Sequence, residues 1–467
     1  MLPAPMLPTP MLPTPMLPTP LRQPPAGFAE ATAALEALDT TLLSGLGRLS
    51  DAQRGALRGL SSAFAGSPLG PRVSAAVDLA CAGPAPEAAM VGLAAAREAL
   101  QGARADALAA PLDALLGRPA QPIPATTQVD APAEALGLLG NARQWLVELA
   151  LAGLGQVDPS AVTAFDTSLG ELQLISPQVV RPATLLTGFH QELLSRLPLA
   201  AMTDAPRARW ADLWARALLV CLPSAPRPSS APVEGATFTP WMVEAQHHRN
   251  MVSAVIWGVL EHGDAPQVVR TTLSGWRVDA LAGDESWWAV LRGHPRALRA
   301  VGEGRALRVT GALCSTGDLI LSDAEPGAPV DPVQVATAAM SLTRWPQMAA
   351  TDRHPVQIAA PVYIAGPLTL VDGVACAPLG DGILPVCVDR VSPLQGLDLG
   401  ALTKAERLWG LVRWDAGRWS VQPLAAQAKG AKAALAWPGV AIAAAKVASD
   451  TLESLHERAT KLLRKKS

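Results

Sequence analysis

The segment TDRHP at residues 351–355 brings several residues that could do chemistry into one short loop. His354 could act as a general base oriented by Asp352, as in hydrolases that activate a serine or cysteine nucleophile. Neither a Gly-x-Ser-x-Gly elbow nor a catalytic-cysteine signature occurs in the chain to supply that nucleophile. The competing interpretation is a turn in which Asp352 caps the start of a strand, and we favour it. A hydrolase that uses this loop is kept as an alternative function.

A local basic cluster is formed by Arg292, Arg296, Arg299, Arg305 and Arg308. Two tryptophans lie just before it, so this stretch could bind nucleic acid through phosphate contacts and base stacking. Acidic residues dilute the cluster, and the whole chain carries a net charge of −2. The competing interpretation is an amphipathic helix with a solvated arginine face. We therefore expect no nucleic-acid partner and keep nucleic-acid binding through residues 292–308 as a second alternative.

Tryptophans and arginines alternate across an expected β-hairpin at residues 409–424. Successive side chains of a strand point to opposite faces, so two tryptophans share one face and two arginines the other. Protein interfaces favour both residue types. The interaction candidates of the chain are therefore Trp414, Trp419, Arg413 and Arg418, together with Trp287 and Trp288.

Several catalytic and metal-binding classes lack the residues that they require. Every lysine lies at or beyond Lys404, and no Gly-Lys-Ser/Thr tripeptide occurs, which excludes a Walker-type phosphate loop. The five cysteines include no Cys-x-x-Cys pair, and none lies near a histidine at ligand spacing, which argues against a structural zinc site. Their odd number and the lack of a secretory signal fit reduced thiols. His247 and His248 are adjacent, so on a strand they would point to opposite faces. We expect no cofactor and no metal.

The first twenty residues repeat the unit Met-Leu-Pro-x-Pro four times. This leader has neither the charged start nor the continuous apolar segment of a secretory signal, and its prolines forbid a helix. We predict a disordered, extended leader over residues 1–25, and we expect that deletion of residues 1–20 leaves folding intact. No long apolar run occurs elsewhere. The sequence thus predicts no membrane span and a cytoplasmic protein.

Residues 26–222 show the three-to-four-residue apolar period of α-helices, with a proline-rich linker near residues 118–132. In the segment RARWADLWARALLVCL, Trp210 and Trp214 share one face of the expected helix, whereas Asp212 falls elsewhere. This pattern indicates a helix that packs its apolar face on a core. Frequent glycines make such helices depend on tertiary packing.

A second linker, at residues 223–235, precedes a mixed, β-rich region at residues 236–426. Residues 427–467 then return to a helical pattern with a basic end. The predicted fold class is α+β. An α-helical N-terminal half is followed by a mixed, β-rich C-terminal domain that contains most of the tryptophans, and by a terminal helix.

Local motifs place individual elements within the β-rich region. Residues 251–260 are apolar and β-branched on both faces, as in a covered strand. A hairpin is expected across residues 315–317. Asp331 before a proline predicts a helix start with Asp as the N-cap. Thr403 and Glu406 fit a capping box for a further short helix.

Three runs, RARWADLWARALLVCL, VVRTTLSGWRVDALAGDESWW and TDRHPVQIAAPVYIAG, resemble a bacterial protein family. Its members are accessory proteins encoded beside MoxR-type AAA ATPases, von Willebrand factor A proteins and SWIM zinc-finger proteins. The resemblance implies an NTP-dependent conflict or chaperone-like assembly. The chain lacks the SWIM cysteine–histidine pattern, the Walker motif and the von Willebrand Asp-x-Ser-x-Ser motif, so no family functional residue is carried over. What remains is the non-enzymatic component.

We therefore interpret the chain as a non-catalytic interaction or adaptor component of a larger bacterial assembly. The resemblance implies protein partners, namely an AAA ATPase and a von Willebrand factor A protein. The Pro-rich leader, a terminal helix and the tryptophan anchors suit such a role.

Overall fold

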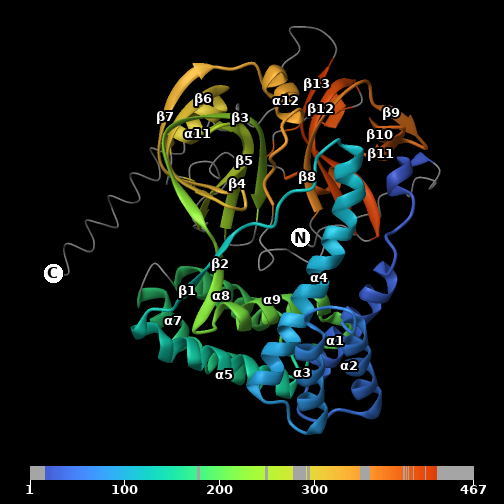
Figure 1. Cartoon of the computed structure of the whole chain (residues 1–467), viewed down its shortest axis with the longest axis vertical. Coiled ribbons are helices and arrows are strands. Elements are labelled where there is room, and N and C mark those ends of the chain that lie inside the picture. Colours follow the sequence, from blue (N-terminus) through green and yellow to red (C-terminus); the bar gives the residue numbers. More distant parts are fainter. Residues whose placement is uncertain are drawn as a thin grey trace, which may run out of the picture.

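The computed structural model describes residues 16–175, 179–247, 251–276, 291, 295–347, 358–392, 395, 397, 399–402, 404–415 and 417–428. The fold is α+β, with helices in the N-terminal half and antiparallel sheets in the C-terminal half, as the sequence predicts. In Figure 1 the strand-rich part lies above the helical part. Most of the expected terminal helix lies outside the described residues.

Nine helices of the described residues form the helical part, and their apolar faces meet in one core. The fully buried Trp210 and Trp214 belong to this core, which confirms the stripe predicted for that helix. The helices are α1 (Phe28–Ser44), α2 (Asp51–Ala63), α3 (Gly70–Ala82), α4 (Glu87–Leu115), α5 (Leu136–Ala152), α6 (Pro159–Thr163), α7 (Asp166–Ile175), α8 (Val180–Leu194) and α9 (Arg207–Val220).

The long helix α4 connects the helical part to the strand-rich part (Figure 1). It has 29 residues, which at 1.5 Å per residue gives a length of about 43 Å. Met90 and Leu93 near its start are fully buried in the core of the helices. Leu108 and Leu112 near its end are buried in a core of the strand-rich part. One helix therefore contributes to both cores.

The first sheet has five antiparallel strands in the order β5-β4-β3-β6-β7. A bridge between Arg270 and Asp318 brings its two edge strands together, so the sheet curls around an apolar interior. Helix α11 (Pro295–Gly302) packs into this interior. The strands are β3 (Ser230–His247), β4 (Met251–Glu261), β5 (Gln267–Trp276), β6 (Arg305–Cys314) and β7 (Leu319–Pro329).

Two smaller sheets and short helices complete the strand-rich part. One sheet has the order β13-β12-β8 and the other β11-β10-β9. Four tryptophans, Trp241, Trp257, Trp345 and Trp409, are buried in a single core shared by the first sheet, α12 and the β13-β12-β8 sheet. The elements are α12 (Pro332–Met340), β8 (Ile358–Ala365), β9 (Thr369–Val371), β10 (Val374–Leu379), β11 (Gly382–Pro385), α13 (Leu399–Leu402), β12 (Ala405–Asp415) and β13 (Arg418–Ala428).

Most local motifs of this region have the predicted structure. The expected hairpin forms, with Trp414 opposite Trp419 in the pairing of β12 with β13. The Asp331 side chain accepts a hydrogen bond from the Val333 backbone N–H at 2.8 Å, as expected of an N-cap. The hairpin across residues 315–317 joins β6 to β7. The capping box is wrong, because Glu406 lies in strand β12 rather than in a helix.

The two segments expected to be linkers contain strands that pair with each other. Strand β1 (Thr126–Asp130) runs antiparallel to β2 (Ser224–Pro228). Strand β3 begins at Ser230, inside the second of these segments, and continues through Pro240. Proline has no backbone N–H to donate to the ladder. The pairing register of β3 with β4 shifts next to Pro240, and this irregularity accommodates the missing donor.

Part of the leader packs on the strand-rich part, contrary to the expectation of a disordered segment up to residue 25. Residues Thr19–Leu21 form a 3-10 turn, and Leu21 is only 3% exposed. Its neighbours include the buried end of α4.

Among the described residues, no helix is long and apolar enough to cross a membrane.

Candidate functional site

The catalytic candidates and two interaction candidates fall outside the described residues. Asp352 and His354 of the 351–355 loop are in this group, as are Trp287 and Trp288. The hydrolase alternative therefore stays a prediction.

The described arginines of the 292–308 cluster do not share one surface. Arg299 on α11 forms an exposed ion pair with Glu303, with Nε 2.8 Å from Oε1. Helix α11 covers the face of β6 that carries Leu307. Because side chains alternate along a strand, the exposed Arg308 projects from the opposite face of β6. The structure thus separates two of the cations that the nucleic-acid alternative requires on one side.

The arginine of the predicted hairpin makes an internal contact. Arg413 is 4% exposed, and its Nη2 donates to Glu244 Oε1 of β3 at 2.5 Å. Its Nε donates to Gln422 Oε1 of β13 at 2.9 Å. Burial lowers the pKa of Arg413, while the carboxylate of Glu244 opposes that change. Arg413 therefore ties the β13-β12-β8 sheet to β3, whereas Arg418 at the turn is partly exposed.

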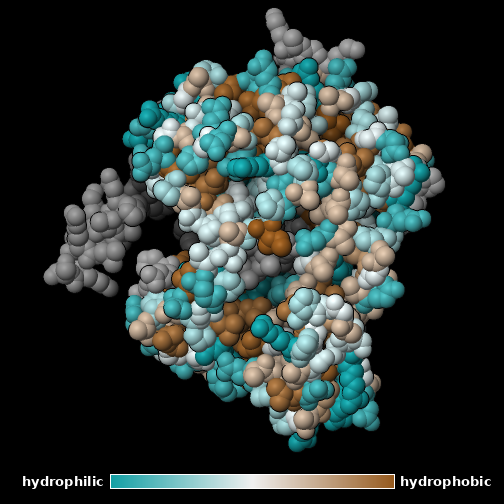
Figure 2. Space-filling view, in the orientation of Figure 1, coloured by the Kyte–Doolittle hydropathy of each residue, from teal (hydrophilic) through white to brown (hydrophobic). Residues whose placement is uncertain are grey.

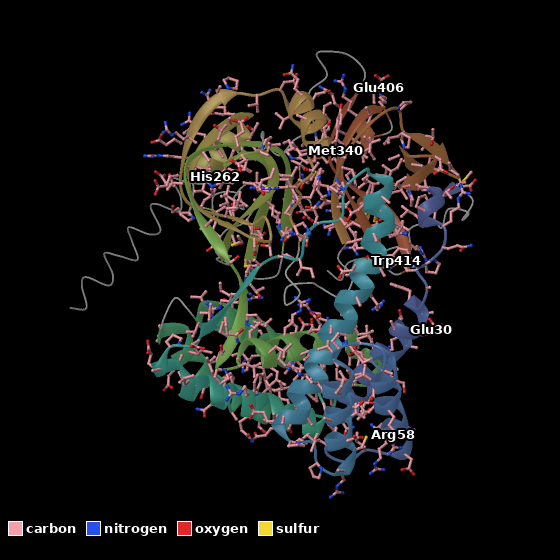
Figure 3. All side chains as sticks on the ribbon, in the orientation of Figure 1. Glu30, Arg58, His262, Met340, Glu406 and Trp414 are labelled. Atoms are coloured by element: carbon pink, nitrogen blue, oxygen red, sulfur yellow. The ribbon has the colours of Figure 1, made fainter. Side chains whose placement is uncertain are left out.

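The hairpin tryptophans also contact the rest of the chain. Figure 3 shows Trp414 at the end of the strand-rich part that faces the helices. Its ring lies 5.0 Å from that of Trp419 and 5.9 Å from that of Phe28 at the start of α1. The Arg104 guanidinium lies 4.7 Å from the Phe28 ring centroid. Trp419 is 4% exposed. Because Trp414 belongs to the strand-rich part and Phe28 to α1, their contact helps to join the two parts of the molecule.

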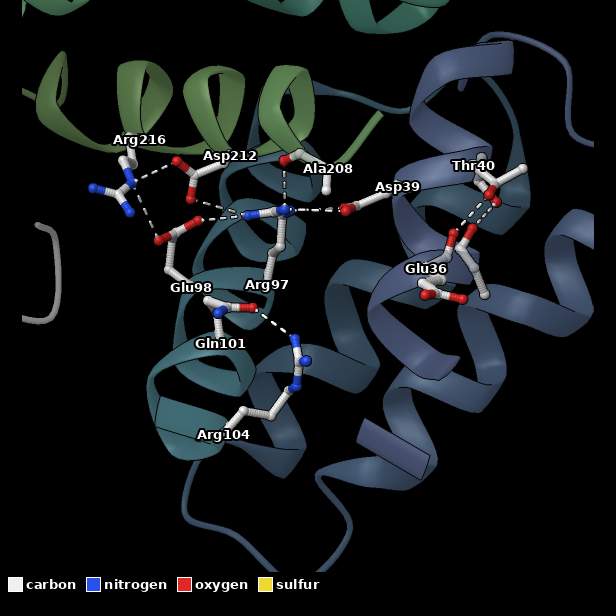
Figure 4. A network of polar contacts seen from close by, with 12 residues as sticks. Glu36, Asp39, Thr40, Arg97, Glu98, Gln101, Arg104, Ala208, Asp212 and Arg216 are labelled. Atoms are coloured by element: carbon white, nitrogen blue, oxygen red, sulfur yellow. Dashed lines mark hydrogen bonds and ion pairs between the residues drawn. The ribbon is translucent and has the colours of Figure 1, made fainter. Parts of the chain in front are cut away.

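A buried network of charges holds three helices together (Figure 4). Arg97 of α4 is 1% exposed, and its Nε and Nη2 donate to the two carboxylate oxygens of Asp39 at 2.7 and 3.0 Å. Its Nη1 donates to Glu98 Oε1 at 3.0 Å and lies 3.5 Å from Asp212 Oδ1 of α9. The Ala208 carbonyl accepts a further bond from Nη2 at 3.1 Å. Although burial opposes it, the contact with Asp39 raises the pKa of Arg97.

The network brings three carboxylates into contact with two guanidinium groups. Arg216 Nε lies 3.1 Å from Asp212 Oδ2 and 3.8 Å from Glu98 Oε2. Burial, reinforced by the charge of Asp212, raises the pKa of Glu98 to about 7. Burial also raises the pKa of Asp39 and of Asp212. Near neutral pH this set can hold one proton, and that proton would balance its excess negative charge.

Perturbed carboxyl groups are frequent in active sites, but buried ion networks perturb pKa values too. Here the carboxylates belong to α1, α4 and α9, and all three are less than 10% exposed. None of them lines either of the two pockets described below. The network therefore suits helix packing better than work on a substrate.

A small apolar pocket lies where α8 and α9 meet the β1–β2 ribbon. Its volume is about 110 Å³. Figure 2 shows hydrophobic residues on the side of the helical part that faces the strand-rich part. The pocket is lined by Arg181, Pro182, Leu219, Val220, Leu222, Ala225, Pro226 and Arg227. It offers an apolar surface with two arginines, a combination that the sequence analysis did not single out.

A second, polar hollow lies beside the turn between β4 and β5. Its volume is about 400 Å³, and it is lined by Glu234, Glu261, His262 and Asp264 among others. His262 is labelled in Figure 3. Within the part of the chain that the structure describes, no group of three or more His, Cys, Asp or Glu residues could hold a metal ion. The hollow is therefore the weaker candidate.

Comparisons with known proteins give no match: no family model, no curated protein and no solved structure is similar to this chain. The partners implied by the resemblance thus remain proposals.

Proposed function

We propose that the protein is a non-catalytic interaction component of a larger bacterial assembly, and that the pocket between α8, α9 and β2 receives a segment of a partner protein. The observation that carries this proposal is the apolar lining beside Arg181 and Arg227. A cavity of about 150 Å³ can hold a benzene ring, so about 110 Å³ suits one branched aliphatic side chain.

The partners that the resemblance implies are an AAA ATPase and a von Willebrand factor A protein. If these partners are encoded beside this chain, co-expression with each of them tests the proposal. A stable complex by size-exclusion chromatography is the expected result. A chain that associates with neither protein contradicts this assignment.

The pocket itself is tested by Ala225→Arg, which adds a long charged side chain to its lining. We expect this change to weaken partner binding at least tenfold, because it blocks the space for an apolar side chain. Thr126→Arg, on the exposed start of the same ribbon, is the matched control and should bind normally. Titration calorimetry measures both affinities. Equal binding by the two variants would remove the pocket from the interface.

A further inference from the structure

The turn between β10 and β11 holds the fourth repeat unit of the leader, residues 16–20. The Thr19 backbone N–H donates to Asp381 Oδ1 at 2.9 Å, and its hydroxyl donates to Oδ2 at 2.5 Å. These bonds lower the pKa of Asp381, so its ionised form is favoured. Gly382 lets the two backbones approach, because a Cβ atom there would lie 2.4 Å from the Pro18 nitrogen. The turn thus fits this peptide closely.

Apolar side chains hold the same segment on both sides of the threonine. Leu21 is buried in one core with Leu108 and Leu112 of α4. Leu17 packs against that core from the other side of the unit, and Pro18 is buried. We call the β10–β11 turn with the end of α4 the cradle. The cradle binds the pattern Leu-Pro-Thr-Pro followed by an apolar residue.

The sequence contains this pattern more than once. Residues 6–10 and 11–15 have the same five letters, MLPTP, as the docked unit. The residue that follows them is Met11 or Met16, where the docked unit is followed by a leucine. Exchange of Leu for Met in a core costs little, because Met is apolar and flexible. The first unit differs, since Ala4 replaces the threonine and has no hydroxyl to donate.

We propose that the cradle is a binding site for the MLPTP unit, and that residues 11–15 of the same chain exchange with residues 16–20 in it. Docking of the third unit lengthens the connection to α1 from residues 21–27 to residues 16–27, which disfavours it only about twofold. It also loses the hydrogen bond from Arg22 Nε to the Leu17 carbonyl, 2.8 Å long. The fourth unit is therefore the main occupant and the third a minor one.

The occupant belongs to the same chain because of effective concentration. A unit attached by a short connection reaches the cradle at about millimolar effective concentration. A unit of a second molecule would have to displace it from dilute solution. The proposal stands apart from the partner pocket on α8 and α9, since the two surfaces share no residue.

Cysteine pairs in the full chain test the exchange. Thr19→Cys with Asp381→Cys should form a disulfide within one molecule almost completely, because these side chains touch. Thr14→Cys with Asp381→Cys should form the same disulfide more slowly. Its yield should rise when Leu17→Ser and Leu21→Ser weaken the fourth unit. Non-reducing gels and mass spectrometry identify the bonds among the native cysteines.

Ala26→Cys with Asp381→Cys is the matched control for random collision, since Ala26 is exposed and lies a similar distance along the chain from Thr19. A Thr14 bond no faster than the Ala26 bond overturns the proposal. Thr14 bonds found only between two molecules overturn it as well, and would assign the exchange to a second copy.

A second measurement needs no disulfide. Thr19→Val alone should lower the unfolding temperature less than the triple change Thr9→Val, Thr14→Val and Thr19→Val, because intact units can replace the damaged one. Equal losses in the single and the triple variant would show that only the fourth unit docks.

Discussion

Asp212 shows how a polar residue in a helical pattern can be buried. Its position on α9 is away from the tryptophan face, the face that the sequence assigns to the core. The structure leaves it 3% exposed, because α4 covers that side of α9 and supplies Arg97 as a partner. The period of one helix shows which residues share a face. It does not show that two faces are covered, and it cannot name a partner more than a hundred residues away.

The charge network has a testable pH dependence. The pKa of Glu98 is about 7 in the folded chain, above its ordinary value of 4.5, since burial disfavours the carboxylate. The folded chain therefore binds a proton at Glu98 more tightly than the unfolded chain does, and this binding adds to the free energy of unfolding. The contribution is fully present below pH 4.5 and is lost as the pH rises through about 7. At most it amounts to about 3 kcal/mol. We expect Glu98→Gln to flatten the decline in unfolding free energy between pH 5.5 and 8. Urea denaturation at pH 5.5 and at pH 8 measures this decline in the unchanged chain and in the variant.

Glu171→Gln, at an exposed position of α7, is the control for removal of one charge. It should leave the pH dependence as in the unchanged chain. If Glu98→Gln declines as steeply as this control, Glu98 is not the group that takes up the proton.

Arg413, an interaction candidate, is likewise buried by an element that its own sequence pattern does not predict. Alternation correctly placed it on the face of the hairpin opposite Trp414, and this polar face was expected to be available to a partner. Strand β3 covers that face, and its Glu244 pairs with Arg413. The residues of the hairpin were therefore predictable, but the element opposite them was not. The apolar pocket was not predictable either, because the start of α8 must pack against residues 219–227, which lie more than thirty positions further along the chain.

At the scale of elements, the sequence predicted a helix or strand correctly where a single local sequence signal was strong. The β12–β13 hairpin, the α12 cap and strand β4 were each specified by alternation, by an Asp-Pro pair or by a β-branched run. Strand β3 was missed because Pro240 and neighbouring glycine and proline residues indicate loops. Shifts in pairing register absorb these residues without ending the strand. Pairing with β4 and β6 therefore decides that this segment is a strand, although its own residues indicate a loop.

Two glycines in different elements should respond oppositely to alanine. A Cβ at Gly258 of β4 would lie 2.2 Å from the Phe238 ring of β3. Gly258→Ala should therefore force the paired strands apart and lower the unfolding free energy by about 1–3 kcal/mol. Gly55→Ala in α2 meets no atom within 4 Å and should raise it by about 0.5–1 kcal/mol, because alanine favours a helix. Chemical denaturation measures both, and changes of the same sign would contradict this reading.

At the scale of the whole molecule, the sequence predicted two classes of structure in the correct order. It did not predict that they share elements. Composition suggested breaks near residues 118–132 and at 223–235, yet strands in these segments pair with each other. Helix α4 and the end of the leader both reach the core of the β13-β12-β8 sheet. Contacts between distant segments, which no local pattern encodes, create this connection.

Shared elements should make the two parts unfold together. Leu93→Ala removes a buried side chain from the core of the helices, and Leu112→Ala removes one from the core of the strand-rich part. Each change should cost about 2–5 kcal/mol and lower the temperature of one common transition in scanning calorimetry. Two transitions, with each variant shifting a different one, would show that the parts are independent.

Helix α4 also sets a limit on how the chain can be divided. A fragment that ends at residue 222 would retain Leu108 and Leu112 but lose the strands that cover them. A fragment that starts at residue 223 would lack both leucines and Leu21 from the same core. Each fragment would expose apolar surface to water, so separate expression of the halves should give aggregates rather than two working modules.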